Sequence, residues 1–170
     1  MQVQAERLRQ VDPANVERAM RAMLGLSVYQ AHCGLEPSLL ELVKLRASQI
    51  NGCAYCLDMH TKDARARGES EQRLYLLDAW RESPFYSARE RAALAWTEAV
   101  TLVAESRVPD AVYEEARRQF SDDELLALTM AVATINAWNR LNVALRTVPG
   151  RYQPGMFDAV DRDATRTAAD

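Results

Sequence analysis

Apolar residues recur at helical spacing along most of the chain, and prolines and glycines divide it into segments of helix length. The first helix is predicted to begin at Pro13, preceded by the N-cap Asp12, and to end near Gly34. A second helix begins at Pro37 and ends around residues 51–52. The first third of the chain is therefore predicted to be helical.

A third helix is predicted from about Cys53 to Arg67, with Asn51 as its N-cap and Gly68 as its C-terminal glycine. Ser70 follows and can cap a short fourth helix. The short third helix carries most of the residues with distinctive chemistry.

Two Ser-x-x-Glu sequences, at 87–90 and 121–124, match the capping box that begins a helix. Pro109 opens a short helix between them, and the last helix runs over 122–146. We find no convincing strand, so the pattern predicts an all-α, single-domain subunit of about six to seven helices. Because the last helix is apolar around much of its girth, it must be buried in a core or a subunit interface, and we expect an oligomer.

The periodicity stops after Pro149-Gly150. We therefore expect a helical domain over residues 1–150 and a C-terminal tail over 151–170, which packs on a neighbouring subunit or stays mobile.

Charge and composition narrow the class of protein. The 170 residues carry a net charge of −3 with interspersed signs, which disfavours nucleic acid or an anionic membrane surface as the partner. No apolar run approaches the roughly 18 residues that span a bilayer. Three cysteines, with no positively charged start leading into an apolar run, indicate a cytoplasmic protein without a structural disulfide framework. We expect no membrane association and a small ligand.

Two of these cysteines and one of the two histidines lie within eight residues, in the stretch INGCAYCLDMH. In a helix, the Cα atoms of Cys53 and Cys56 would be about 5 Å apart, a separation that a disulfide tolerates. His60 follows Cys56 by four residues and shares its helix face. A thiol of pKa about 8.5 is only about 3% ionised at pH 7, so a helix start and a histidine that accepts its proton would both raise its reactivity.

The spacing of these residues resembles that of a known family. With Glu41 placed twelve residues before Cys53, the pattern Glu-x(11)-Cys-x-x-Cys-x-x-x-His is similar to that of alkylhydroperoxidase-D-like proteins of the carboxymuconolactone decarboxylase superfamily. The segments KLRASQINGCAYCLDMHTKDAR and AVATINAWNRLN also resemble this group, and the resemblance covers about residues 15–148.

The resemblance implies an all-helical subunit, a homo-trimer or homo-hexamer, that reduces organic hydroperoxides. Cys56 would be the peroxidatic thiolate and Cys53 the resolving thiol. Glu41 and His60 would form the proton relay. A dithiol would reduce the disulfide, and the best-known donor in the family is dihydrolipoamide on a carrier protein. No cofactor or metal is implied.

Two observations run against what the resemblance implies, one for the cysteine roles, where we follow Cys56 as the peroxidatic residue, and one for the proton relay. The helix dipole acts most strongly at Cys53, whereas proximity to His60 favours Cys56. In addition, the best-characterised members carry a histidine where this chain has Tyr55, and a phenol of pKa about 10 cannot relay protons near neutral pH.

Other functions remain as alternatives. Zinc could be held by Cys53, Cys56 and His60 with Glu41 as a fourth ligand, in a metal-binding or structural helical protein without redox cycling. Decarboxylation of a muconolactone would share the superfamily fold but has no need of a cysteine pair. The last helix also carries four residues that we expect to serve interhelical hydrogen bonding, namely Asn136, Trp138, Asn139 and Arg140.

Overall fold

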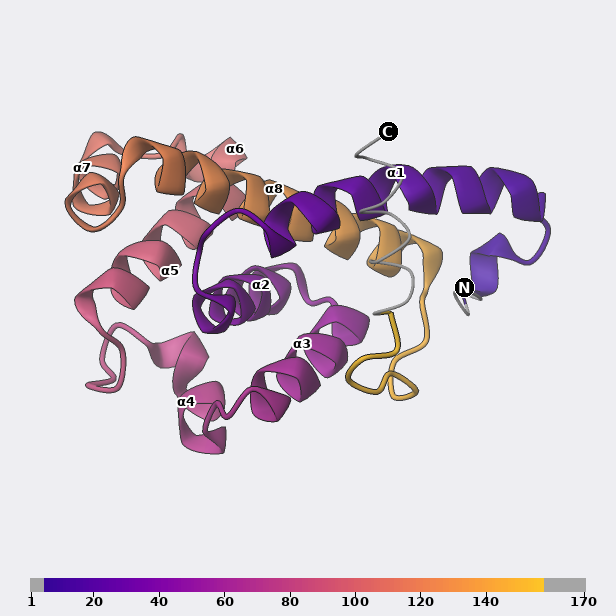
Figure 1. The fold of residues 1–170 in the computed structure, drawn as a ribbon, viewed down its shortest axis with the longest axis horizontal. Helices are drawn as coiled ribbons and strands as arrows, with labels where there is room; N and C mark the ends of the chain where they lie inside the picture. The colour runs from indigo at the N-terminus through magenta and orange to yellow at the C-terminus, as the bar shows by residue number, and fades with distance from the viewer. Residues whose placement is uncertain (1–4, 158–170) are drawn as a thin grey trace.

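The computed structural model describes residues 5–157, and within that range the chain is helical with no β-strand (Figure 1). One isolated antiparallel bridge joins Ala5 to Thr147. The all-α prediction is therefore confirmed. The elements in order are η1 (Glu6–Leu8), α1 (Pro13–Ala31), α2 (Pro37–Asn51), α3 (Ala54–Ala66), α4 (Glu71–Leu76), η2 (Leu77–Ala79), α5 (Ala88–Thr101), α6 (Val103–Ser106), α7 (Asp110–Gln119) and α8 (Asp122–Leu145). None of the described helices is long and apolar enough to cross a membrane.

The helix starts follow the capping signals. At α5 and α8, Ser87 and Ser121 each accept a hydrogen bond from the amide three residues on, and the carboxylate of the glutamate there accepts one from the serine amide. Ser70 caps α4 in the same way by accepting from the amide of Arg73. These three predictions are confirmed.

The predicted N-cap of α3 is wrong. Asn51 is the last residue of α2, and its amide group donates to Asn136 and Asn139 on α8, at 2.9 Å in each case. Cys53 occupies the N-cap position of α3 instead. The reason is Gly52, which adopts a left-handed conformation (φ 63°) and ends α2 within one residue.

Helix α2 lies at the centre of the molecule, in contact with α3, α5 and α8 (Figure 1). Most of its side chains are buried, including Leu42, Val43 and Ala47, which are fully buried. α8 packs across α2, and α1 lies alongside α8. This arrangement buries the face of α2 that carries Glu41, which is only 3% exposed.

After α8, residues 148–157, which we call the C-terminal segment, run beside α3 (Figure 1). The Lys62 ammonium group donates to the carbonyl of Tyr152 at 2.9 Å, and Asp58 accepts from the amide of Gly150 at 2.9 Å. The start of the expected tail therefore packs on its own chain. Residues 158–170 lie outside the described residues, and the division at residue 150 stays a prediction.

Candidate active site

A two-residue turn between α2 and α3 positions the cysteine pair. The amide of Cys53 donates to the carbonyl of Ser48 at 3.0 Å, and the carbonyl of Cys53 accepts the first hydrogen bond of α3 from Leu57 at 2.9 Å. Cys53 occupies the N-cap position of α3, so its thiol lies beside the backbone amides of the first turn, among which those of Cys56 and Tyr55 lower its pKa. The turn therefore places a thiol where backbone donors stabilise a thiolate.

The two thiols are unlinked in this structure, and each shifts the pKa of the other, in opposite directions. The thiol of Cys56 donates a hydrogen bond to Cys53, and together with the two amides this lowers the pKa of Cys53 from 9.0 to about 7. The same hydrogen bond, burial and the charge on Cys53 raise the pKa of Cys56 above its ordinary value. One thiol of the pair is therefore substantially ionised near neutral pH.

Cys56 is fully buried and Cys53 is 1% exposed, yet only Cys56 lines the large cavity described below. The side-chain amide of Asn142 donates to the sulfur of Cys56 at 3.5 Å. Asn139 is a second donor from α8, placed to stabilise negative charge on either sulfur. Of the two cysteines, Cys56 is thus the one that lines the cavity, with no surface exposed to solvent in this structure.

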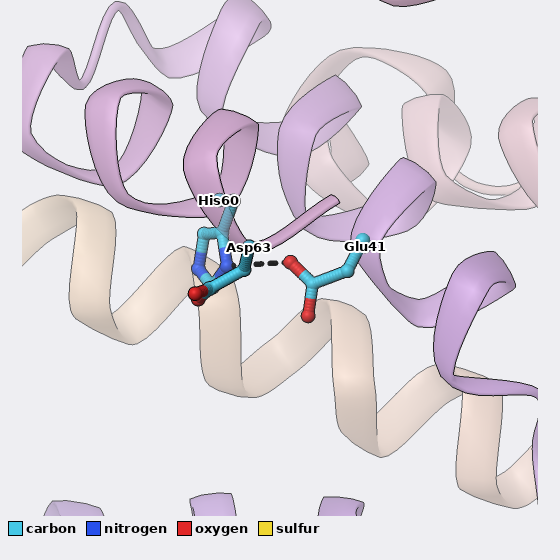
Figure 2. Close-up of side chains that lie close together, drawn as sticks. All are labelled: Glu41, His60 and Asp63. Atoms are coloured by element: carbon cyan, nitrogen blue, oxygen red, sulfur yellow. Dashed lines mark hydrogen bonds and ion pairs between the residues drawn. The ribbon is translucent and has the colours of Figure 1, made fainter. Parts of the chain in front are cut away.

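Glu41 and His60 point toward each other from α2 and α3, with 2.9 Å between Glu41 Oε2 and His60 Nδ1 (Figure 2). The pKa of Glu41 is about 2, because the hydrogen bond to His60 and the nearby positive charges outweigh the opposing effect of burial. A carboxylate can only accept, so Nδ1 carries the proton and Nε2 is the nitrogen free to accept one. Among the described residues, His60 bonds to Glu41 and not to Cys56.

Two cations contact the same carboxylate. Arg67 and Lys44 approach Glu41 Oε1 at 2.6 and 3.1 Å. Asp63, one turn after His60, lies beside this pair (Figure 2). Its carboxylate accepts a hydrogen bond from the Tyr152 hydroxyl at 2.8 Å. Burial, and secondarily the charge of Glu41, raise the pKa of Asp63, although the bond from Tyr152 opposes them.

The zinc alternative can be compared with this geometry. Potential ligand atoms of Glu41, His60 and Asp63 lie within 4.8 Å of one another, but no such group among the described residues includes either cysteine. A cation bound at these three residues would also have to compete with Arg67 and Lys44 for Glu41. The described geometry therefore favours a network of ion pairs and hydrogen bonds here over a zinc centre.

A cavity of about 360 Å³ adjoins these residues, with walls from α1, α2, α3, α8 and the C-terminal segment. Its polar end contains Glu41, Tyr55, Cys56, His60 and Asp63. The remaining walls are largely apolar and include Met20, Leu24, Leu40, Ile135, Trp138 and Leu141. This combination of an apolar body and a few convergent polar groups is typical of a site for a small organic molecule.

Tyr55 lies between the two cysteines in the sequence and lines the cavity. Burial and the charge of Cys56 raise the pKa of its phenol above the ordinary value. It stays neutral near pH 7. The polar residues of α8 form interhelical hydrogen bonds as expected: Asn139 donates to Ser48 at 3.0 Å, and Trp138 to Ser27 at 3.1 Å. Arg140 instead donates within α8, to Asn136.

The four residues expected to form the site lie in two pairs, Cys53 with Cys56 and Glu41 with His60. Sequence reasoning did not select the other polar members of the site, which are Lys44, Asp63, Arg67, Asn142 and Tyr152. For Lys44 and Asp63 a signal existed, because each lies three residues after a chosen residue and so on the same helix face.

Comparison with known proteins places these features in context. The sequence model of the carboxymuconolactone decarboxylase family matches residues 14–99. The uncharacterized protein YdfG of Bacillus subtilis is 43% identical over 126 residues, which is 74% of this chain and 86% of that protein.

Solved structures show the same fold. A protein of unknown function from Agrobacterium tumefaciens, provisionally named an antioxidant defence protein AhpD, has a TM-score of 0.79 and 44% identity, covering 84% of this chain and 99% of that one. An uncharacterized peroxidase-related protein from Silicibacter has a TM-score of 0.70 at 24% identity, covering 84% of this chain and 75% of that one. The debrominase Bmp8 has a TM-score of 0.69 at 20% identity, covering 90% and 77%. These last two likenesses concern the fold alone.

Proposed function

The chain belongs to the carboxymuconolactone decarboxylase family, with an alkylhydroperoxidase-D-like fold, and on this premise we propose that it is a thiol-dependent peroxidase for organic hydroperoxides. The observation that carries the proposal is the pair of unlinked cysteines one helical turn apart, of which Cys56 lines a cavity with a largely apolar wall.

Cys56 is the peroxidatic residue of this proposal, because it is the cysteine of the pair that lines the cavity. As Cys56 attacks, its proton passes along the existing hydrogen bond to the Cys53 thiolate. The sulfur forms a bond to the terminal peroxide oxygen, the O–O bond breaks, and Cys56 becomes a sulfenic acid. The departing alkoxide takes the proton held by Nε2 of His60 and leaves as an alcohol.

Cys53 then closes the cycle. Its sulfur attacks that of Cys56, an S–S bond forms, and the sulfenic oxygen leaves as water with the thiol proton. The net reaction converts two thiols and one hydroperoxide into a disulfide, an alcohol and water. An external dithiol, such as the dihydrolipoamide of a carrier protein, restores the thiols by exchange.

Glu41 and His60 act as the proton relay. Since Nδ1 of His60 donates to Glu41, Nε2 is the nitrogen that exchanges protons with the reacting groups in the cavity. Glu41 stabilises the imidazolium that forms when Nε2 takes up a proton. We further propose a homo-trimer or homo-hexamer as the working assembly and the cytoplasm as its location.

Thiol counting tests the proposal directly. In a Cys33→Ser background, one equivalent of cumene hydroperoxide should consume both remaining thiols per chain, and dihydrolipoamide should restore them. Unchanged thiol counts, or stoichiometric zinc in protein purified without added metal, would contradict a redox function.

Single cysteine variants then test the roles. Cys53→Ser should leave a sulfenic acid on Cys56 that dimedone traps, whereas Cys56→Ser should not consume peroxide. A dimedone adduct on Cys53 in the Cys56→Ser variant would reverse the two roles.

A further inference from the structure

Tyr152 connects the C-terminal segment to the residues around His60. Its hydroxyl donates to Asp63 Oδ1 at 2.8 Å, its ring packs against Phe157 with 5.6 Å between centroids, and the residue is 6% exposed. The contact joins residues that are 89 positions apart in the sequence. Tyr152 and Asp63 both line the cavity that contains Cys56.

The backbone around Tyr152 is held in place. Lys62, the neighbour of Asp63 in α3, donates to the carbonyl of Tyr152 and forms an ion pair with Asp58 at 2.9 Å. Asp58 in turn accepts from the amide of Gly150. The phenol of Tyr152 is therefore held near Asp63 by a segment that is bonded to α3 at two points, the amide of Gly150 and the carbonyl of Tyr152.

The charged residues around Asp63 indicate how it could act beside Glu41, as a second negative charge near His60. The charged or titratable groups that act on it are Glu41 from α2, His60 from α3 and Arg67 at the C-cap of α3, while Lys44 contacts Glu41. The single negative charge of Glu41 is already met by Lys44 and Arg67. Lys44 and Arg67 already carry two positive charges against the one negative charge of Glu41, and protonation of His60 adds a third. Asp63 is the other anion whose carboxylate lies within 4.8 Å of both relay residues.

We propose that Tyr152 is a positioning residue that holds the Asp63 carboxylate ionised beside His60, so that Asp63 acts with Glu41 in stabilising the protonated imidazole. The inference rests on the proposed peroxidase function and adds a second carboxylate, and a residue from the far end of the chain, to its proton relay.

The chemistry of the contact supports this role. Burial and the charge of Glu41 raise the pKa of Asp63, and both favour its neutral form. A donated hydrogen bond favours the ionised form, because a carboxylate accepts more strongly than a carboxylic acid. Removing the Tyr152 hydroxyl therefore raises the pKa of Asp63 further, and the carboxylate is lost at a higher pH than in the wild type.

The Tyr152→Phe variant tests the contact because it keeps the ring that packs on Phe157 and removes only the hydroxyl. Carbon-13 NMR of the side-chain carboxylates, with the Asp63 signal assigned by its absence in Asp63→Asn, should show an upward shift in the Asp63 titration midpoint. Tyr75→Phe is the matched control: Tyr75 also donates to a carboxylate, that of Glu71, but on the exposed surface of α4. An unchanged Asp63 midpoint in Tyr152→Phe would overturn the inference.

The pH profile of cumene hydroperoxide reduction tests the role. In Tyr152→Phe, the acidic limb of kcat should move to higher pH with KM unchanged, leaving the rate between about twofold and tenfold lower at the acidic end. Tyr75→Phe should match the wild type. In an Asp63→Asn background, Tyr152→Phe should have no further effect on the profile, because Tyr152 acts through Asp63.

These results separate the two proposals. An inactive wild-type protein contradicts the peroxidase function and the relay role with it, while the NMR midpoint still decides whether Tyr152 controls Asp63. An active wild type with a shifted Asp63 midpoint but an unmoved acidic limb in Tyr152→Phe contradicts the relay role alone.

Discussion

Glu41 is a buried carboxylate with three positively charged or hydrogen-bonding partners. His60, Arg67 and Lys44 together satisfy both of its oxygens, so the cost of removing the charge from water is offset by direct contacts. A buried ion is stable only while such contacts are kept, and its protonation therefore affects folding as well as chemistry.

The depressed pKa of Glu41 predicts a stability component that depends on pH. The pKa is about 2 in the folded chain and 4.5 as a reference for the unfolded one, so the component is fully present above pH 4.5 and is lost as pH falls toward 2. It amounts to on the order of 3 kcal/mol, about 2 kcal/mol of which is lost between pH 7 and pH 3. Urea unfolding at these pH values should show that Glu41→Gln loses about 2 kcal/mol less on acidification than the wild type does. Glu114→Gln, at an exposed position of α7, should run parallel to the wild type, and parallel behaviour of Glu41→Gln would refute the assignment.

At the scale of secondary structure, the turn between α2 and α3 is the element on which the cysteine pair depends. Gly52 alone separates the end of α2 from the N-cap of α3, and its left-handed conformation reverses the chain without a longer loop. Because of this short connection, Cys53 sits at the helix start, where the backbone donors are.

Two glycines should respond in opposite directions to substitution by alanine. Gly25 is exposed within α1 and has no heavy atom within 4 Å of an added Cβ, so Gly25→Ala should stabilise the protein by about 0.5–1 kcal/mol. Gly52 also has free space, but its φ of 63° disfavours an L side chain, and Gly52→Ala should destabilise by about 1–2 kcal/mol. Thermal unfolding of both variants measures this difference, and equal effects would mean that the backbone at Gly52 is not strained by a side chain.

Local signals explain which parts of the fold could be predicted from the sequence. Capping boxes act between residues three positions apart, so Ser87 and Ser121 identified their helices correctly. Asn51 is not the N-cap of α3 because α2 continues through it and ends at Gly52, which leaves its side chain to bond to α8, 85 and 88 residues away. The one-turn helix α6 carries no side-chain cap and was not predicted.

The same distinction applies to the site. Spacing within α3 identified His60 and both cysteines, and the similar spacing of Asp63 could have added it. Tyr152 carried no signal, since nothing near it in the sequence indicates that the C-terminal segment returns to α3. The spacing of residues within one or two helical turns cannot predict side chains that meet only through long-range tertiary contacts.

At the scale of the whole molecule, residues from near both ends of the chain enclose the cavity. Leu8 in η1 and Tyr152 and Phe157 in the C-terminal segment all line it, and the bridge between Ala5 and Thr147 joins the two ends of the described chain. Polar contacts hold the C-terminal segment against α3. Lys62 donates to the carbonyls of Gly150 and Tyr152 and also pairs with Asp58.

Lys62→Ala should loosen the C-terminal segment. The variant loses the donor to the carbonyls of Gly150 and Tyr152, and a loss of about 1–1.5 kcal/mol in local stability increases opening about tenfold. Limited trypsin digestion should therefore cut after Arg151 about tenfold faster, as followed by mass spectrometry. Arg65→Ala, which removes an exposed α3 cation paired with Glu71, should leave this cleavage rate unchanged. Equal rates in Lys62→Ala and the wild type would show that Lys62 does not hold the segment.

Residues 41–67 contain every proposed redox and relay residue except Tyr152, which bonds to Asp63. Helix α1, by contrast, contributes only residues that line the cavity. The residues proposed for the reaction and the α1 residues that shape the cavity thus lie in separate segments of the chain. Substitutions at lining residues such as Met20 and Leu24 should therefore alter the shape of the substrate that the cavity accepts, while leaving the proposed redox and proton-relay residues unchanged.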